Sequence, residues 1–99
     1  MNKIDFGWVI QPAPRGNLDA AGLIEANHKF IQALRGKFST IWIEDHFQWD
    51  SRPTLECWTT LTYLAALYPE FRFGTLVLGQ SYRNPAHTAK MAAVLQLLT

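Results

Sequence analysis

Asp45 and His46 are adjacent titratable residues that follow a strand-like stretch at positions 40–44. A histidine titrates near neutral pH, so its ring can donate or accept a proton during a reaction. A neighbouring carboxylate can hold or charge that ring, although adjacent residues along a strand point to opposite sides. We predict that Asp45 and His46 are catalytic; the structural alternative is that Asp45 caps the loop and His46 is a satisfied loop residue.

The other reactive side chains lack the partners that a metal site or a nucleophilic centre needs. The three histidines share no i,i+4 spacing and Cys57 is the only cysteine, so we expect no metal site and a buried structural thiol. His28 and His87 are expected to be solvated. The sequence contains no Gly-x-Gly-x-x-Gly or Walker-type loop, which disfavours a Rossmann or phosphate-loop enzyme.

Three strand-like segments alternate with three helix-like segments along the chain. The aromatic and β-branched composition predicts strands over residues 4–10, 40–44 and 71–78. The strand starts lie roughly 30–36 residues apart, a spacing typical of βα units with a parallel sheet. The sequence therefore predicts the α/β class.

The helices are predicted from their caps and apolar stripes. Asn17 or Asp19 can cap the first helix, and Gly36 can end it. Its predicted stripe consists of Leu23, Ala26, Phe30, Ala33 and Leu34. Pro53 suits the first turn of the second helix, and Asn84 caps the third. The third helix is predicted to carry on one face Thr88, Met91, Leu95 and Leu98.

Three βα units predict a sheet with one open face. Crossovers of one hand place their helices on one side of a three-stranded sheet, whereas a parallel sheet needs both faces covered. A closed (β/α)8 barrel covers both faces but typically needs about 250 residues. We therefore predict one partial domain over residues 1–99, the first three βα units of an incomplete barrel. Its open edges and open face predict self-association; a small unrelated α/β binding domain is a weaker alternative.

Composition excludes several classes of partner. Nine Lys and Arg residues against eight Asp and Glu give a net charge of +1 with no basic stripe, so no nucleic-acid partner is expected. No apolar run approaches the roughly 20 residues of a membrane span, and Asp5 interrupts the apolar core that a signal peptide would need. With a single cysteine, a cytoplasmic location is expected.

Several motifs occur in an order and spacing that resemble the bacterial luciferase-like superfamily. They are IWIEDHF at 41–47, RPTLECWTT at 52–60, GTLVL at 74–78, YRNPA at 82–86 and AKMAA at 89–93. The resemblance covers nearly the whole chain. It implies a (β/α)8 barrel that uses reduced FMN or the deazaflavin coenzyme F-420 to reduce or oxygenate a small organic substrate. The choice between the two cofactors stays open.

The resemblance also implies where the cofactor lies. In such barrels function gathers at the carboxyl ends of the strands, and in some deazaflavin members a histidine at the place of His46 lies near the ring. The family often has a non-prolyl cis peptide behind the ring, which the match places between Leu76 and Val77. The residues expected to contact the cofactor are Gln11, Glu56, Thr75, Leu76 and Val77. The alternatives are an ordinary buried strand and, for Glu56, a carboxylate favoured by the helix dipole alone.

Related chains usually continue beyond the point matched by Thr99, with a Ser-Gly-Gly-Arg turn and further units that carry much of the cofactor surface. The resemblance therefore implies that these 99 residues are inactive by themselves. The alternative function is a truncated, non-catalytic fragment or a partial barrel that self-associates.

Overall fold

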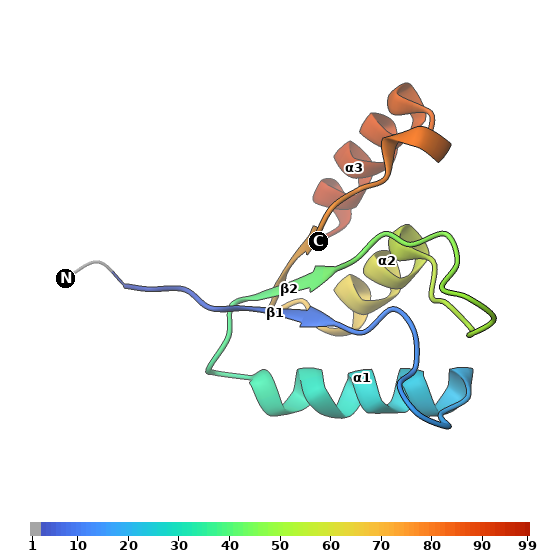
Figure 1. Ribbon diagram of the computed structural model, residues 1–99. Helices are drawn as coiled ribbons and strands as arrows, with labels where there is room; N and C mark the ends of the chain where they lie inside the picture. The colour runs from blue at the N-terminus through green and yellow to red at the C-terminus, as the bar shows by residue number, and fades with distance from the viewer. Residues whose placement is uncertain (1–2) are drawn as a thin grey trace.

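Residues 3–99, which the computed structural model describes, form three parallel strands and three α-helices in strict alternation (Figure 1). The strands are neighbours in the order β1-β2-β3. The elements are β1 (Gly7–Ile10), α1 (Ala20–Leu34), β2 (Thr40–Ile43), α2 (Cys57–Leu67), β3 (Arg72–Thr75), a 3-10 turn (Gln80–Tyr82) and α3 (Pro85–Leu98). The predicted α/β class and the parallel βα units are confirmed.

The strands are shorter than predicted because each can pair only along the length of its neighbour. Gly7 pairs with Thr40 and Ile10 with Ile43, so β2 limits β1 at both ends. Before Gly7, the Phe6 carbonyl accepts hydrogen bonds from Ser39 alone among the described residues, from its N–H at 2.9 Å and its hydroxyl at 3.4 Å. The predicted strand starting at residue 4 is therefore wrong over its first three residues.

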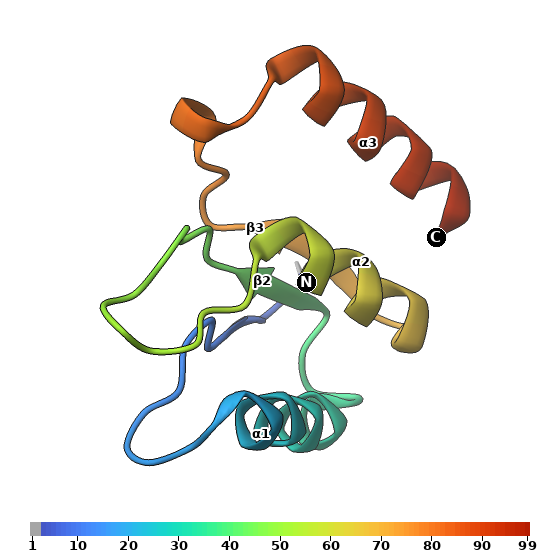
Figure 2. The same ribbon diagram turned by 90° about the vertical axis from the view of Figure 1, so that its right-hand side faces the viewer.

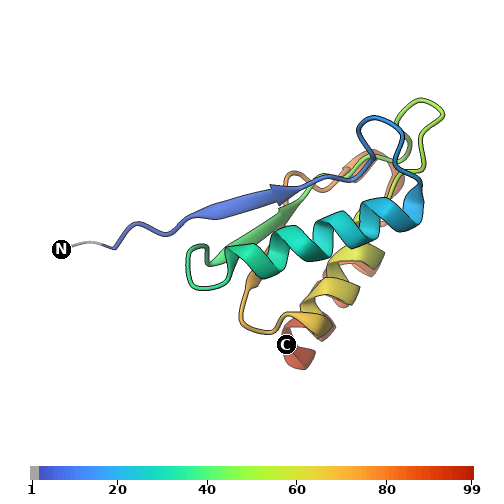
Figure 3. The same cartoon turned by 90° about the horizontal axis from the view of Figure 1, so that it is seen from below.

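The two faces of the sheet have different surroundings. Ile10, Ile41 and Ile43 are buried on the side that carries the helices. They share that core with Ile31, Leu34, Cys57, Leu61, Leu64, Tyr68 and Phe71. The helices form an arc on this side of the sheet (Figures 2 and 3). One covered face is the arrangement expected from crossovers of a single hand.

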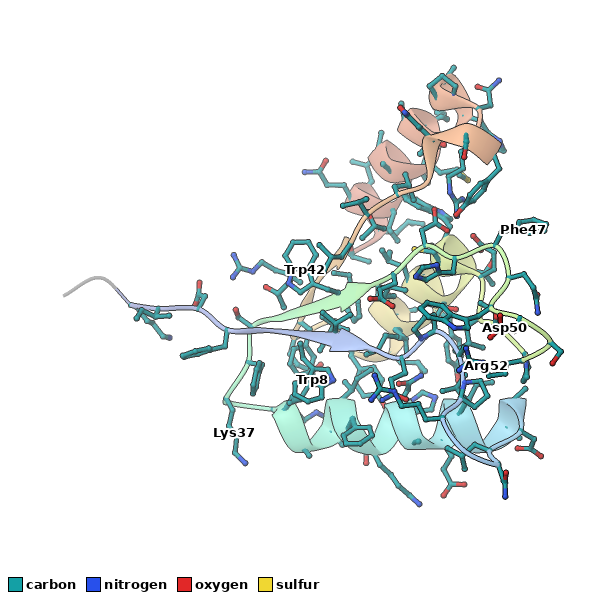
Figure 4. The ribbon with its side chains drawn as sticks, in the orientation of Figure 1. Trp8, Lys37, Trp42, Phe47, Asp50 and Arg52 are labelled. Atoms are coloured by element: carbon teal, nitrogen blue, oxygen red, sulfur yellow. The ribbon has the colours of Figure 1, made fainter. Side chains whose placement is uncertain are left out.

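Trp42 lies on the opposite face of the sheet, where Figure 4 shows it away from α1, whereas Trp8 lies toward α1. The Trp42 indole extends over both neighbouring strands. A Cβ atom added to Gly74 would lie 2.5 Å from Trp42 Cζ3, and one added to Gly7 would collide with Trp42 Nε1. One indole thus spans β1, β2 and β3, and glycine leaves room for it on both sides.

Helix α1 begins and ends at the predicted residues but buries a different face. The Asp19 side chain accepts a hydrogen bond from the Gly22 N–H at 2.8 Å, and Gly36 has a positive φ of 74° just beyond the helix. The buried residues are Leu23, Asn27, Ile31 and Leu34. The predicted stripe was wrong at Phe30 and Ala33, which are exposed. Asn27 sets the face, because its buried amide donates to the Gln11 carbonyl at 3.0 Å.

Helix α2 begins at Cys57, whereas the sequence analysis placed its first turn at Pro53. Glu56 is its N-cap and accepts hydrogen bonds from Trp58 N at 3.0 Å and Thr59 N at 2.7 Å. Pro53 lies in the preceding loop, where Thr54 Oγ1 accepts from Trp49 N at 3.0 Å. A side chain that satisfies two free N–H groups defines the start of the helix.

Helix α3 is the most loosely held element. Asn84 caps it as predicted, accepting from His87 N at 3.1 Å, but none of its residues is buried. Thr88, Met91 and Leu95 are half-buried, whereas Leu98, predicted on the same face, is 77% exposed. A cavity of about 490 Å³ separates α2 from α3. Within residues 3–99, no helix is long and apolar enough to cross a membrane.

Candidate functional site

The chain segments that leave the three parallel strands meet at one edge of the sheet. Figure 4 shows Phe47, Asp50 and Arg52 at this edge, beyond the heads of the strand arrows, and Lys37 at the opposite end. The β2 exit bonds directly to the β3 exit, because Gly79 N donates to Asp45 Oδ2 at 2.7 Å. The geometry thus brings loop residues from distant parts of the sequence to one end of the molecule, where parallel α/β proteins place their sites.

A cavity of about 410 Å³ lies between the exits of β1 and β2. Its lining includes Gln11, Glu44, Trp49 and Arg52. The His46 ring packs edge-on against Trp49, with 4.3 Å between ring centroids. The cavity therefore combines aromatic surface with charged and amide groups, a combination suited to a small organic ligand.

His46 is accessible and has a carboxylate neighbour, but that neighbour is Glu44. The distance from His46 Nε2 to Glu44 Oε2 is 3.7 Å, and the His46 side chain is 41% exposed. Glu44 was missed by the sequence analysis. The signal was present, because residues two apart in an extended chain point to the same side.

The Asp45 carboxylate points away from the His46 ring into the protein. It accepts hydrogen bonds from Arg83 Nε at 2.9 Å and Arg83 Nη2 at 2.8 Å, in addition to Gly79 N. Its side chain is only 2% exposed. Burial opposes ionisation, but the bonds from Arg83 and Gly79 outweigh it and hold the pKa of Asp45 below its usual range. Asp45 is thus engaged in a structural ion pair.

Arg83 also reaches the start of α2. Its Nη2 donates to Glu56 Oε1 at 2.7 Å, so one guanidinium joins two carboxylates. Partial burial of Glu56 works against its ionisation, but hydrogen bonds from Thr59 N and Arg83 prevail and lower its pKa to about 2. In this structure Glu56 is the N-cap of α2; the predicted structural alternative had placed it within the first turn, favoured by the helix dipole alone. The role of Arg83 was not foreseen, since no local pattern identifies a pairing across 27–38 residues.

The predicted cofactor residues on β3 have a distinct geometry. The peptide bond between Leu76 and Val77 is cis, as the resemblance implied. Leu76 is 48% and Val77 72% exposed, whereas Thr75 is half-buried. An apolar surface is thus available directly after β3. Gln11 is the cofactor residue predicted after β1. Its main-chain carbonyl accepts a hydrogen bond from the Asn27 side chain, and the residue lines the cavity beside Glu44.

Cys57 is a buried structural thiol, as predicted. It is fully buried, and its Sγ lies 3.8 Å from the Ile43 carbonyl. Burial, with the negative charge of Asp45 nearby, raises the pKa of Cys57 to about 12. A protonated, enclosed thiol is a poor nucleophile. Among the described residues, no three His, Cys, Asp or Glu side chains gather as metal ligands.

Comparison with known proteins identifies the family. The family model described as luciferase-like monooxygenase matches residues 4–99. Searches of curated proteins and of solved structures gave no significant match. The match rejects the alternative of a small unrelated α/β domain and agrees with the motifs at the ends of β2 and β3. The chain belongs to the luciferase-like monooxygenase family.

Proposed function

We propose that this chain forms the first three βα units of a (β/α)8 oxidoreductase or monooxygenase that uses reduced FMN or coenzyme F-420 on a small organic substrate. One observation carries the proposal beyond family membership. The accessible His46 ring lies at the carboxyl edge of a parallel sheet, against Trp49 and beside Glu44. A titratable group at this edge is where barrel enzymes place their chemistry.

The residues after β3 fit a flat cofactor ring. Leu76 and Val77 present exposed apolar surface on which such a ring can lie, and Thr75 precedes them with a hydroxyl. Gln11 offers an amide on the β1 side. The bound cofactor supplies the hydride or reducing equivalent, while the protein orients it and excludes water. Glu56 supports this site through Arg83 and the helix cap.

In this proposal His46 moves the proton. Its Nε2 faces the Glu44 carboxylate at 3.7 Å, which can orient the ring. The ring is accessible to a ligand in the adjoining space and can give or take a proton as the substrate gains or loses charge. The fixed ion pair of Asp45 keeps that carboxylate out of the proton exchange.

The test is anaerobic titration of the full-length protein with reduced FMN and with reduced coenzyme F-420, followed by cofactor fluorescence. We expect one of them to bind. We expect His46→Ala to retain binding but slow oxidation of the bound cofactor by about 10²–10⁴-fold, the usual contribution of a general acid or base. His87→Ala, in the first turn of α3, is the matched control and should change neither. Failure of the unaltered protein to bind either cofactor rejects the proposal.

A second candidate function is that of a partial barrel that self-associates without catalysis. The exposed side chains of Val9 and Leu76 favour it, because apolar surface on an open sheet invites a partner. Light scattering distinguishes the two functions. A monomer that binds cofactor supports the enzyme, whereas a cofactor-free oligomer supports the assembly.

A further inference from the structure

We propose that Arg83 is a positioning residue, which fastens the β2 exit carrying His46 to the β3 exit carrying Leu76 and Val77. This inference rests on the proposed function, because it assigns to these two exits the proton-transfer and cofactor surfaces. The hydrogen bonds of the Arg83 side chain go to Asp45 and Glu56, not to His46, Leu76 or Val77. It acts through Asp45, which directly precedes His46 in the chain.

Residue 45 is held at both its side chain and its backbone. The carboxylate takes the two Arg83 bonds and the Gly79 N–H, while the Asp45 carbonyl accepts from Tyr82 Oη at 2.8 Å. These donors all lie within the five residues 79–83 of the β3 exit. Fixing the side chain and the carbonyl of one residue leaves the following residue little freedom of direction.

Gly79 is part of the same device. A Cβ atom at this position would lie 2.6 Å from Tyr82 Cζ, so only glycine lets the tyrosine ring lie close enough to reach the Asp45 carbonyl. The residues 45, 79, 82 and 83 therefore form one unit, which we call the exit latch.

The charges make the latch specific for arginine. One largely buried guanidinium serves two carboxylates, Asp45 through two nitrogens and Glu56 through one. A lysine is a point charge and cannot reproduce that fork. Without the guanidinium, the buried Asp45 carboxylate would keep the hydrogen bond from the Gly79 N–H but would have no positive charge beside it. An unpaired buried charge strongly destabilises the structure around it.

An ion pair that only adds stability would behave differently from a positioning latch. The distinguishing readout is the contact between His46 and Trp49, which lie 4.3 Å apart by ring centroids and belong to neither partner of the ion pair. Nuclear Overhauser effects between these rings report the direction of the β2 exit in the cofactor-free protein. They do not depend on whether the proposed cofactor binds.

The experiment compares Arg83→Gln and Arg83→Lys with Arg72→Gln in the full-length protein. Arg72 is the control, because it is an exposed arginine paired with Asp5 at the other end of β3. We expect Arg83→Gln to abolish the ring-to-ring effects and to slow oxidation of bound cofactor about 100-fold, as for a misplacement of about 1 Å. Arg83→Lys should recover only part of both, and Arg72→Gln should change neither.

Retention of the His46–Trp49 effects in folded Arg83→Gln protein overturns the inference. If that variant does not fold, Tyr82→Phe removes one latch hydrogen bond alone; weakened effects support the latch and unchanged effects overturn it. Loss of the effects without any cofactor binding by the unaltered protein supports the latch and rejects the proposed function. The two ideas can therefore fail separately.

Discussion

Glu56 shows how one side chain can serve both a helix and an ion pair. Its carboxylate satisfies two free N–H groups of α2 and also accepts from Arg83. We expect Glu56→Ala to lower the free energy of unfolding by about 1–2 kcal/mol, as for loss of an N-cap. Glu25→Ala, which removes an exposed i,i+4 partner of Lys29, should lower it far less, because solvent screens such a pair. Urea denaturation of both variants measures the difference, and equal losses would contradict the capping role.

The two carboxylates that pair with Arg83, Asp45 and Glu56, predict how the free energy of unfolding depends on pH. Asp45 and Glu56 have pKa values below their ordinary 3.8 and 4.5, so folding favours their charged forms. Their contribution is complete above the unfolded pKa values and is lost as pH falls below about 5 toward about 2. In the double variant Asp45→Asn and Glu56→Gln, the free energy of unfolding should depend less on pH across this interval. An unchanged pH dependence in urea titrations would count against the ion pair.

The Cys57 thiol is expected to be unreactive in the folded protein. With its pKa raised to about 12 by burial, the thiol stays protonated and enclosed at pH 8. We expect no reaction with a disulfide reagent such as DTNB in the folded protein and full reaction in urea. Rapid labelling without denaturant would show that the α2 side of the core opens.

Part of the candidate site could be predicted residue by residue. His46 at the end of β2 followed from its type and from the strand before it, and the cis bond after Leu76 followed from the resemblance. The pairing of Asp45 could not be predicted, because its partner lies 38 residues away. Adjacency in sequence suggested a pair with His46, whereas in the chain that leaves β2 the Asp45 carboxylate is buried against Arg83 and the His46 ring is accessible.

Some helix boundaries and buried faces are set by neighbouring residues in the sequence, and others by contacts with distant residues. The starts of α1 and α3 follow from Asp19 and Asn84, whose own side chains make the caps. The buried face of α1 depends on Asn27, a polar residue that an apolar stripe omits and whose partner follows β1. The start of α2 is set by the Glu56 side chain, and the sequence analysis placed it near Pro53 because it did not consider a glutamate as a cap.

The packing of β2 against its neighbours gives a prediction about whole strands. We expect Gly74→Ala to cost about 1–3 kcal/mol, because the new Cβ would displace the Trp42 indole. In a Trp42→Leu background the same change should cost less, with a coupling of about 0.5–3 kcal/mol. A double-mutant cycle in urea measures it. Additive effects would show that the indole does not depend on the glycine.

At the scale of the molecule, the open face of the sheet predicts association of the 99-residue chain. Leu76 and Val9 are exposed there, and an apolar sheet face without a cover tends to find one. We expect light scattering to detect an oligomer that Leu76→Glu disperses. Leu18→Glu, which changes an exposed leucine in the loop before α1, is the control and should leave the oligomer intact. A monomer at all concentrations would contradict this expectation.

The indole of Trp42 also constrains which substitutions can occur on all three strands during evolution. Gly7 on β1 and Gly74 on β3 lack a side chain for the sake of one ring on β2, although 67 positions separate them in the sequence. A change of Trp42 to a small residue would release both glycines at once, whereas a change of either glycine would first require the ring to go. Among descendants of this chain, the three positions should therefore be inherited as a set, with the tryptophan the first to be replaced.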